Sequence, residues 1–102
     1  MKLFLLASVF FLAGGAAFGQ TFTWTGSADN TWENAGNWNC SGCGTWPQNP
    51  IDDDVVIGAG ANIIISGNIN VNRFTMSGGN LNLQTFSLSA DNDVTITGGN
   101  IS

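Results

Sequence analysis

A near-repeat of eight residues constrains the fold of this chain more than any other feature of its sequence. Residues 74–81 read FTMSGGNL, and residues 94–101 read VTITGGNI, 20 positions later. Each copy places two apolar residues two positions apart and then adds a Gly-Gly-Asn corner. Self-similarity at a fixed period of roughly 20–50 residues is typical of folds in which each repeat stacks on the one before.

The repeat belongs to a longer series of apolar pairs at positions i and i+2, which is the period of a strand with one buried face. The pairs are Val55/Ile57, Ile63/Ile65, Ile69/Val71, Phe74/Met76, Leu81/Leu83, Phe86/Leu88 and Val94/Ile96, and Ile101 opens another. Three pairs per repeat predict an all-β fold that begins a right-handed parallel β-helix, a solenoid with turns at 55–73, 74–93 and 94–102.

Stacked turns make specific register predictions. Phe74 should lie beside Val94, Met76 beside Ile96, and Leu81 beside Ile101, in columns inside the solenoid. Gly78-Gly79 and Gly98-Gly99 should form matching corners, where glycine adopts positive φ without steric strain. Asn80 and Asn100 should form an amide ladder. The alternative is an antiparallel β-meander, in which Leu81–Leu83 would run beside Phe86–Leu88.

Residues 1–19 have the layout of a secretory signal peptide. Lys2 precedes an apolar run from Leu3 to Leu12, and small residues follow, with Ala17 and Gly19 at the −3 and −1 positions. We expect cleavage before Gln20 and a secreted or outer-cell-surface location. The alternative is a membrane anchor, but the run is shorter than the roughly 20 residues that span a bilayer. We therefore expect no membrane span after cleavage.

The charge balance argues against a nucleic-acid partner. The chain has seven acidic side chains and two basic ones, and one of the two, Lys2, lies in the predicted signal peptide. Only Arg73 would remain, whereas phosphate binding needs a basic patch. The expected partners are an extracellular glycan or a host or cell surface. Self-association through an open β-helix edge is a further expectation.

Residues 20–54 differ from the turns that follow, and we predict that they form a Trp-rich N-terminal cap with a Cys loop. All four tryptophans lie in FTWTGSADNTWENAGNWNCSGCGTWP, residues 22–47. The pattern resembles the opening segment of large secreted or cell-surface β-helix proteins of Gram-negative bacteria, the adhesin-like and autotransporter-like proteins. The matching residues are Trp24-Thr25-Gly26, Trp32, Ala35, Asn37-Trp38, Pro47 and Asp53-Asp54-Val55-Ile57. The resemblance implies an N-terminal fragment of a larger solenoid protein.

Cys40 and Cys43 form a C-x-x-C pair that is not part of this resemblance. A structural zinc site needs four ligands, and the chain has no His and no other Cys. A redox pair of the thioredoxin type belongs to a βαβ context, which is absent. For an exported protein we favour a local disulfide, with free thiols and metal binding as the alternatives.

The tryptophans have two interpretations. An indole face can stack on a sugar ring, or it can cover the end of a β-helix, where the first core layer would otherwise meet water. We assign Trp24, Trp32 and Trp38 to the covering role. Trp46, beside Pro47 in the Cys loop, is the candidate for an exposed ring and a glycan contact.

Two acidic clusters are candidate calcium ligands. Asp52, Asp53 and Asp54 are consecutive, and consecutive strand side chains cannot all face one ion. We therefore favour a solvated turn that enters the first strand, although calcium binding stays open. Asp91 and Asp93 receive the same interpretation.

The inventory for catalysis is small, because the chain has no His or Tyr and its general-base candidates are carboxylates. We predict no enzyme, no cofactor and no metal, and a structural or adhesion module as the function. The alternative is the N-terminal glycan-binding part of a β-helix carbohydrate-active enzyme, either a polysaccharide lyase or a glycoside hydrolase. A third possibility is an outward ladder of Thr75, Ser77, Thr95 and Thr97 of the ice-binding kind, which Val56 and Gly58 interrupt.

Overall fold

The computed structural model describes residues 20–102, and these are nearly all strands and turns. The predicted signal peptide, residues 1–19, lies outside the described residues. One short 3-10 helix, η2 (Ala35–Asn37), interrupts the strands. The prediction of an all-β fold is confirmed. Among residues 20–102, no helix is long and apolar enough to cross a membrane.

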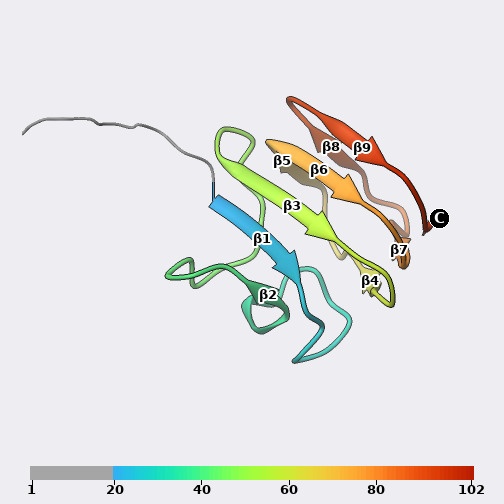
Figure 1. The fold of residues 1–102 in the computed structure, drawn as a ribbon, viewed down its shortest axis with the longest axis horizontal. Helices are drawn as coiled ribbons and strands as arrows, with labels where there is room; N and C mark the ends of the chain where they lie inside the picture. Colours follow the sequence, from blue (N-terminus) through green and yellow to red (C-terminus); the bar gives the residue numbers. More distant parts are fainter. Residues whose placement is uncertain (1–19) are drawn as a thin grey trace, which may run out of the picture.

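The strands form three small sheets (Figure 1). One sheet has the order β2-β1-β3-β6-β9, another β10-β7-β4, and the third pairs β5 with β8. The strand bounds are β1 (Gln20–Trp24), β2 (Trp38–Asn39), β3 (Asp53–Ile57), β4 (Asn62–Ile64), β5 (Ile69–Val71), β6 (Arg73–Met76), β7 (Asn80–Asn82), β8 (Leu88–Ala90), β9 (Val94–Ile96) and β10 (Asn100–Ile101).

The strands from β3 onward repeat in sets, one set per level. We call β3–β5 the first rung, β6–β8 the second rung, and β9 with β10 the third rung. Each strand pairs in parallel with its counterpart in the next rung. Phe74 pairs with Val94, Met76 with Ile96 and Leu81 with Ile101, so the predicted register is confirmed. The parallel pairing excludes the antiparallel meander for these strands.

The Gly-Gly corners also agree with the prediction. Gly79 and Gly99 have φ of 87° and 93°, in the left-handed region that glycine adopts without strain. A Cβ on Gly79 would lie 2.7 Å from Cβ of Ala61 in the rung below. The glycines are therefore required both by the turn and by the close approach of one rung to the next.

Strand β1 was not anticipated as part of the sheet. It pairs in parallel with β3, with Phe22 beside Val55, although residues 20–24 were assigned to the cap region. Its other edge pairs antiparallel with β2, where Trp24 lies opposite Trp38. The antiparallel strand β2 therefore covers the N-terminal edge of this sheet.

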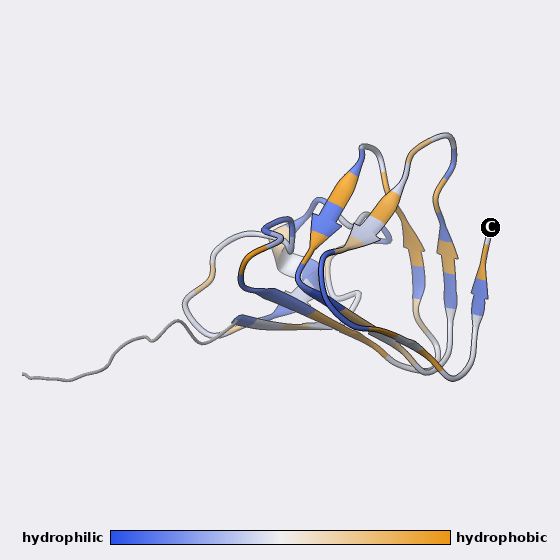
Figure 2. Cartoon of the chain, turned by 90° about the horizontal axis from the view of Figure 1, so that it is seen from above, coloured by the Kyte–Doolittle hydropathy of each residue, from blue (hydrophilic) through white to orange (hydrophobic). Residues whose placement is uncertain are grey.

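The buried apolar residues of the core come from strands of all three sheets, and the hydropathy colouring shows hydrophobic and hydrophilic residues along these strands (Figure 2). One column of that core runs through β1, β3, β6 and β9. Phe22 and Val55 are buried, Phe74 is 3% exposed, and Val94 is 57% exposed. Burial is therefore complete at the N-terminal end of the column and is lost at the third rung.

Two sequence predictions about side-chain direction are wrong. Phe86 lies outside the strands in a turn and is exposed, so it does not form an inward pair with Leu88. The turn closes earlier, where the Phe86 amide donates to the Leu83 carbonyl. Asp53 belongs to β3 rather than to a solvated turn, and only 3% of its surface is exposed.

Candidate functional site

Four aromatic rings form a cluster around β1 and β2. The rings of Trp32 and Trp38 have centroids 4.8 Å apart, and those of Trp24 and Trp38 are 5.1 Å apart, both in edge-to-face orientation. Phe22 meets Trp38 edge-on, at 6.3 Å. Trp32 is fully buried, Trp38 is nearly so, and Trp24 is partly buried against the core. These rings pack on the first core layer, as the covering role requires.

The buried indole N–H groups of this cluster have partners within the chain. Nε1 of Trp32 donates to the Pro47 carbonyl at 2.9 Å, and Nε1 of Trp38 donates to the Trp32 carbonyl at 2.8 Å. A buried donor without a partner costs about 1–3 kcal/mol, so these bonds make the burial of both rings favourable. Neither ring face is free to hold a sugar.

Asn37 holds the loop around the aromatic cluster together. Its Oδ1 accepts from the amides of Ala28 and Asp29, and its Nδ2 donates to Asp29 Oδ1 and to the Thr31 carbonyl. Asp29 also accepts from the Thr31 amide, and this hydrogen bond and those from Asn37 and Asn34 lower the pKa of the Asp29 carboxyl. A side-chain network therefore replaces regular secondary structure over this segment. The sequence pattern marks Asn37 only as part of the Asn37-Trp38 match, and it predicts no hydrogen-bonding role for Asn37 or Asp29.

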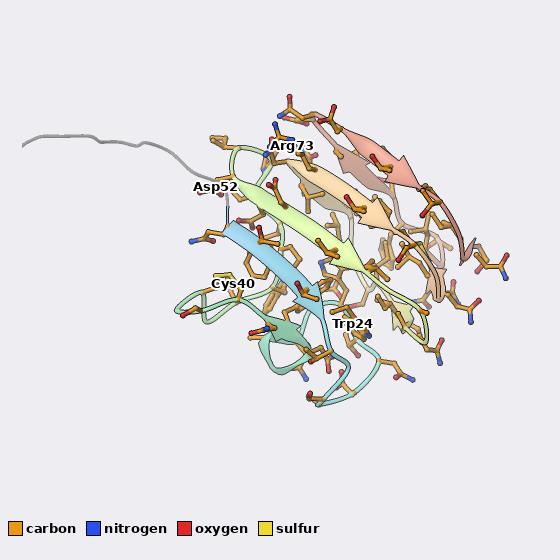
Figure 3. All side chains as sticks on the ribbon, viewed as in Figure 1. Trp24, Cys40, Asp52 and Arg73 are labelled. Carbon is orange, nitrogen blue, oxygen red and sulfur yellow. A yellow bond between two sulfur atoms is a disulfide. The ribbon has the colours of Figure 1, made fainter. Side chains whose placement is uncertain are left out.

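Cys40 and Cys43 are joined by a disulfide, with their Cα atoms 5.5 Å apart (Figure 3). The Cys43 amide also donates to the Cys40 carbonyl, which closes the turn a second time. Both cysteines are partly buried and pack against the core, whereas Ser41 and Gly42 between them are exposed. The predicted disulfide pair is thus present, and it cross-links the loop that leads to Trp46.

Trp46 was predicted to project into solvent, and this prediction is wrong. It is partly buried and packs against the core, and its buried Nε1 has no hydrogen-bond partner among the described residues. The adjoining Pro47 is buried as well. The Trp46 ring therefore offers less open surface than the sequence suggested, and a glycan contact there stays a prediction.

The aspartates at residues 52–54 point to different partners. Oδ2 of Asp53 accepts from the amides of Gln48 and Asn49, both at 3.0 Å. Burial raises the pKa of Asp53; these two hydrogen bonds oppose the shift, and the neighbouring Asp52 carboxylate adds to it. Asp54 faces the other way, toward Arg73. Among residues 20–102, no three His, Cys, Asp or Glu side chains are grouped as metal ligands.

Arg73 lies between two carboxylates on the outward face of the sheet, near the start of β6 (Figure 3). Its Nη1 is 3.7 Å from Asp54 Oδ2 in the first rung, and its Nε is 3.3 Å from Asp93 Oδ2 at the third rung. Such exposed ion pairs contribute about 0–1 kcal/mol each. Acidic and basic side chains thus alternate from rung to rung in the order Asp54, Arg73, Asp93.

The remaining outward face of this sheet carries hydroxyl and β-branched side chains. Thr23, Val56, Thr75 and Thr95 lie in register across four strands. Thr75 and Thr95 form the aligned step predicted from the repeat, and Val56 stands where the ladder was expected to break. Thr23 extends the row onto β1, which sequence analysis did not include.

The comparisons with known proteins give no relative: no family model, no curated protein and no solved structure matches the chain. The resemblance to adhesin-like and autotransporter-like proteins therefore stays a prediction from the sequence. What the structure offers for function is a set of surfaces: a closed aromatic end, an outward Thr-rich face and an open apolar end.

Proposed function

We propose that this chain is an exported, non-catalytic structural module that serves adhesion or display at the cell surface. Its body would be the start of a right-handed parallel β-helix, and a longer solenoid protein would continue it. The observation that carries the proposal is the ordered stack of parallel rungs, which has a covered N-terminal end and an aligned outward face.

The use of the carboxylates supports a non-catalytic role. Asp29 and Asp53 hold backbone amides, and Asp54 accepts from Nδ2 of Asn72 at 2.7 Å. Glu33 accepts from the amide and hydroxyl of Ser66, which ties the cap loop to the first rung. A general base must be free to take a proton from a substrate. These four groups are instead engaged in holding loops and rungs together.

The outward face supports adhesion or display. Thr23, Thr75 and Thr95 present hydroxyl and methyl groups in register, and Arg73 is the only basic side chain among residues 20–102. A surface of this chemistry suits neutral polar partners such as glycans better than anionic polymers. The alternative, a glycan-binding part of a carbohydrate-active enzyme, depends on Trp46, whose ring packs against the core.

The test is retention of protein-coated microspheres on surfaces under flow. We expect microspheres that carry the oxidised chain to be retained on polysaccharide- or mucin-coated glass more strongly than microspheres coated with albumin. The double variant Thr75→Glu/Thr95→Glu should lose this retention, and the matched variant Thr85→Glu/Ser87→Glu, at exposed positions between β7 and β8, should keep it.

Two results would change the proposal. Retention no stronger than that of albumin on every surface would remove adhesion. Retention on a single polysaccharide that Trp46→Ala abolishes and the Thr75/Thr95 variant leaves intact would favour the carbohydrate-active alternative.

A further inference from the structure

Strand β1 begins against the segment that enters β3. Gln20, the first residue of β1, pairs with Asp53 in the parallel register. The main-chain nitrogen of Gln20 donates to the Asp52 carbonyl oxygen at 2.6 Å. Asp52 accordingly lies beside the start of β1 (Figure 3). The nitrogen at which signal-peptide cleavage is predicted is therefore held directly against Asp52.

The carboxylates at this place lack a cationic partner. Arg73 is the only basic side chain of the described residues, and it contacts Asp54 and Asp93. Neither Asp52 nor Asp53 forms an ion pair with a side chain of the described part of the chain. Oδ1 of Asp52 is buried and accepts no hydrogen bond from residues 20–102. A buried polar oxygen without a partner is unfavourable, so a cation at this point would be stabilised.

Cleavage would supply that cation. Hydrolysis of the peptide bond between Gly19 and Gln20 consumes one water; Gly19 leaves with a carboxylate, and the Gln20 nitrogen becomes a primary amine. An α-amino group has an ordinary pKa of about 7.7–8.0, so it is mostly protonated at pH 7. The amide nitrogen has one hydrogen, whereas the ammonium has three. One of these can keep the bond to the Asp52 carbonyl, and the other two are new donors.

We propose that the α-ammonium of Gln20, created by removal of the signal peptide, forms an ion pair with the Asp52 carboxylate. Processing would then fasten the start of β1 to the entrance of β3, in the strand that covers the N-terminal end of the core. Capture of an N-terminal amine by fixed acceptor groups is a known mode of peptide recognition. The inference rests on the export that the proposed function includes, but it does not depend on adhesion.

The ion pair should be visible in the titration of the α-amine. The carboxylates of Asp52 and Asp53 face this amine, whereas Asp54 is engaged with Arg73. Strand β2 and the loop that follows it carry no ionisable side chain except the two cysteines of the disulfide. Pairing should raise the pKa of the α-amine. The added stability is then present below about pH 8 and is lost as the pH rises through the raised pKa.

The test compares three forms of the mature chain by chemical denaturation. One form has the free Gln20 amine, the second is N-acetylated, and the third begins two residues earlier, at Phe18. Acetylation removes the charge but keeps an N–H for the Asp52 carbonyl, and the extension keeps the charge but moves it along the chain. Mass spectrometry verifies the free amine, because closure of Gln20 to a lactam would release ammonia.

We expect the free-amine form to have the largest folding equilibrium constant at pH 7. It should exceed that of either other form by about five- to tenfold, as expected for a charged hydrogen bond at a partly exposed site. The advantage should shrink at pH 10, where the amine is mostly neutral. An NMR titration of the free amine should give a pKa above about 8.

Two variants locate the partner. Asp52→Asn should remove the stability difference between the three forms and return the pKa of the amine to its ordinary range. Asp91→Asn, at an exposed position between β8 and β9, should leave both unchanged. Equal stability of the three forms, or a difference that Asp52→Asn leaves intact, would overturn the proposal. So would secreted chain whose N-terminus is not Gln20. None of these measurements involves a coated surface, so they succeed or fail independently of the adhesion assay.

Discussion

Val55 and Val94 are both valines in one column of the core. Only 1% of the Val55 surface is exposed, whereas 57% of the Val94 surface is exposed. Val55 lies between Phe22 of β1 and Phe74 of β6, whereas Val94 has a neighbour on one side only. The covered and the open end of the stack are thus built from similar strand residues. Burial of a core residue in this stack therefore depends on whether another layer covers it. At the N-terminal end, β1 and the aromatic cluster form that layer.

The largest expected effect comes from the covered end. Trp32→Ala removes a fully buried ring and its hydrogen bond to Pro47, and should lower the free energy of unfolding by about 3–5 kcal/mol. Ile96→Ala at the open end should lower it by less than about 1 kcal/mol, because half of that side chain is already in water. Urea unfolding followed by circular dichroism measures both; similar losses would show that the two ends are equally packed.

The corner glycines should show the next largest effect. Gly79 and Gly42 both have positive φ, so alanine at either position is strained by about 1–2 kcal/mol. Only at Gly79 would the new Cβ also collide with the rung below; the space at Gly42 is open. Gly79→Ala should therefore destabilise the chain by about 1–3 kcal/mol more than Gly42→Ala in the same unfolding assay. Equal losses would mean that the rungs can separate at the corner at no cost.

Loss of the disulfide should have a moderate effect. The double variant Cys40→Ser/Cys43→Ser opens a short loop, for which chain entropy gives up to about 2 kcal/mol of stability. We expect a lower melting temperature and unchanged strand content, since the disulfide lies in the loop of the covered end. A variant as stable as the oxidised chain would show that the second closure, from the Cys43 amide to the Cys40 carbonyl, suffices.

Trp46 should behave differently from Trp32 when its N–H is removed. Trp46→Phe eliminates a buried donor that has no partner among residues 20–102, and should leave stability unchanged or raise it slightly. Trp32→Phe breaks the bond to the Pro47 carbonyl, and should destabilise the chain by about 1–2 kcal/mol. If Trp46→Phe were as damaging as Trp32→Phe, the Trp46 indole would have a partner that its surroundings do not show.

The smallest effect is a pair of opposite pH dependences. The pKa of Asp29 is lowered from its ordinary value of 3.8, so its stabilising contribution is present above that value and is lost as the pH falls below it. The pKa of Asp53 is raised, so its ionisation opposes folding, and this penalty disappears as the pH falls through the raised pKa toward 3.8.

Two amide variants separate these contributions. The advantage of the native chain over Asp29→Asn should shrink between pH 5 and pH 3, and its stability relative to Asp53→Asn should grow over the same range. Chemical denaturation at each pH measures both differences. The same sign for the two would contradict the opposite environments of these carboxylates.

The strands of the rungs were predictable because period-two pairs and a repeated Gly-Gly-Asn corner are local features of the chain. Phe74 beside Val94 and Asn80 beside Asn100 follow from the repeat alone. Strand β1 was not predicted, because Phe22 is flanked by Thr21 and Thr23 and has no repeat partner. Its place depends on pairing with β3, more than thirty residues away.

The candidate site was less predictable for the same reason. Three consecutive aspartates suggest a solvated turn, yet Asp53 is buried, because the amides of Gln48 and Asn49 fold back onto it. Asn37 was noted in the sequence only as part of the Asn37-Trp38 match, and its hydrogen-bonding role appears only when the loop closes around it. The Asp29-x-x-x-x-Asn34 spacing within a loop rich in turn residues was the one available hint of a side-chain network.

The parallel register makes the stack grow slowly along its axis for the number of residues that each repeat uses. A repeat of 20 residues advances the stack by one strand spacing, about 4.8 Å, whereas the same residues fully extended would reach about 66 Å or more. Each outward position therefore recurs every 4.8 Å or so, as Thr75 and Thr95 do. In a protein that extends this stack, the backbone would set the spacing between equivalent outward positions, and the side chains at those positions would set the chemistry of the surface.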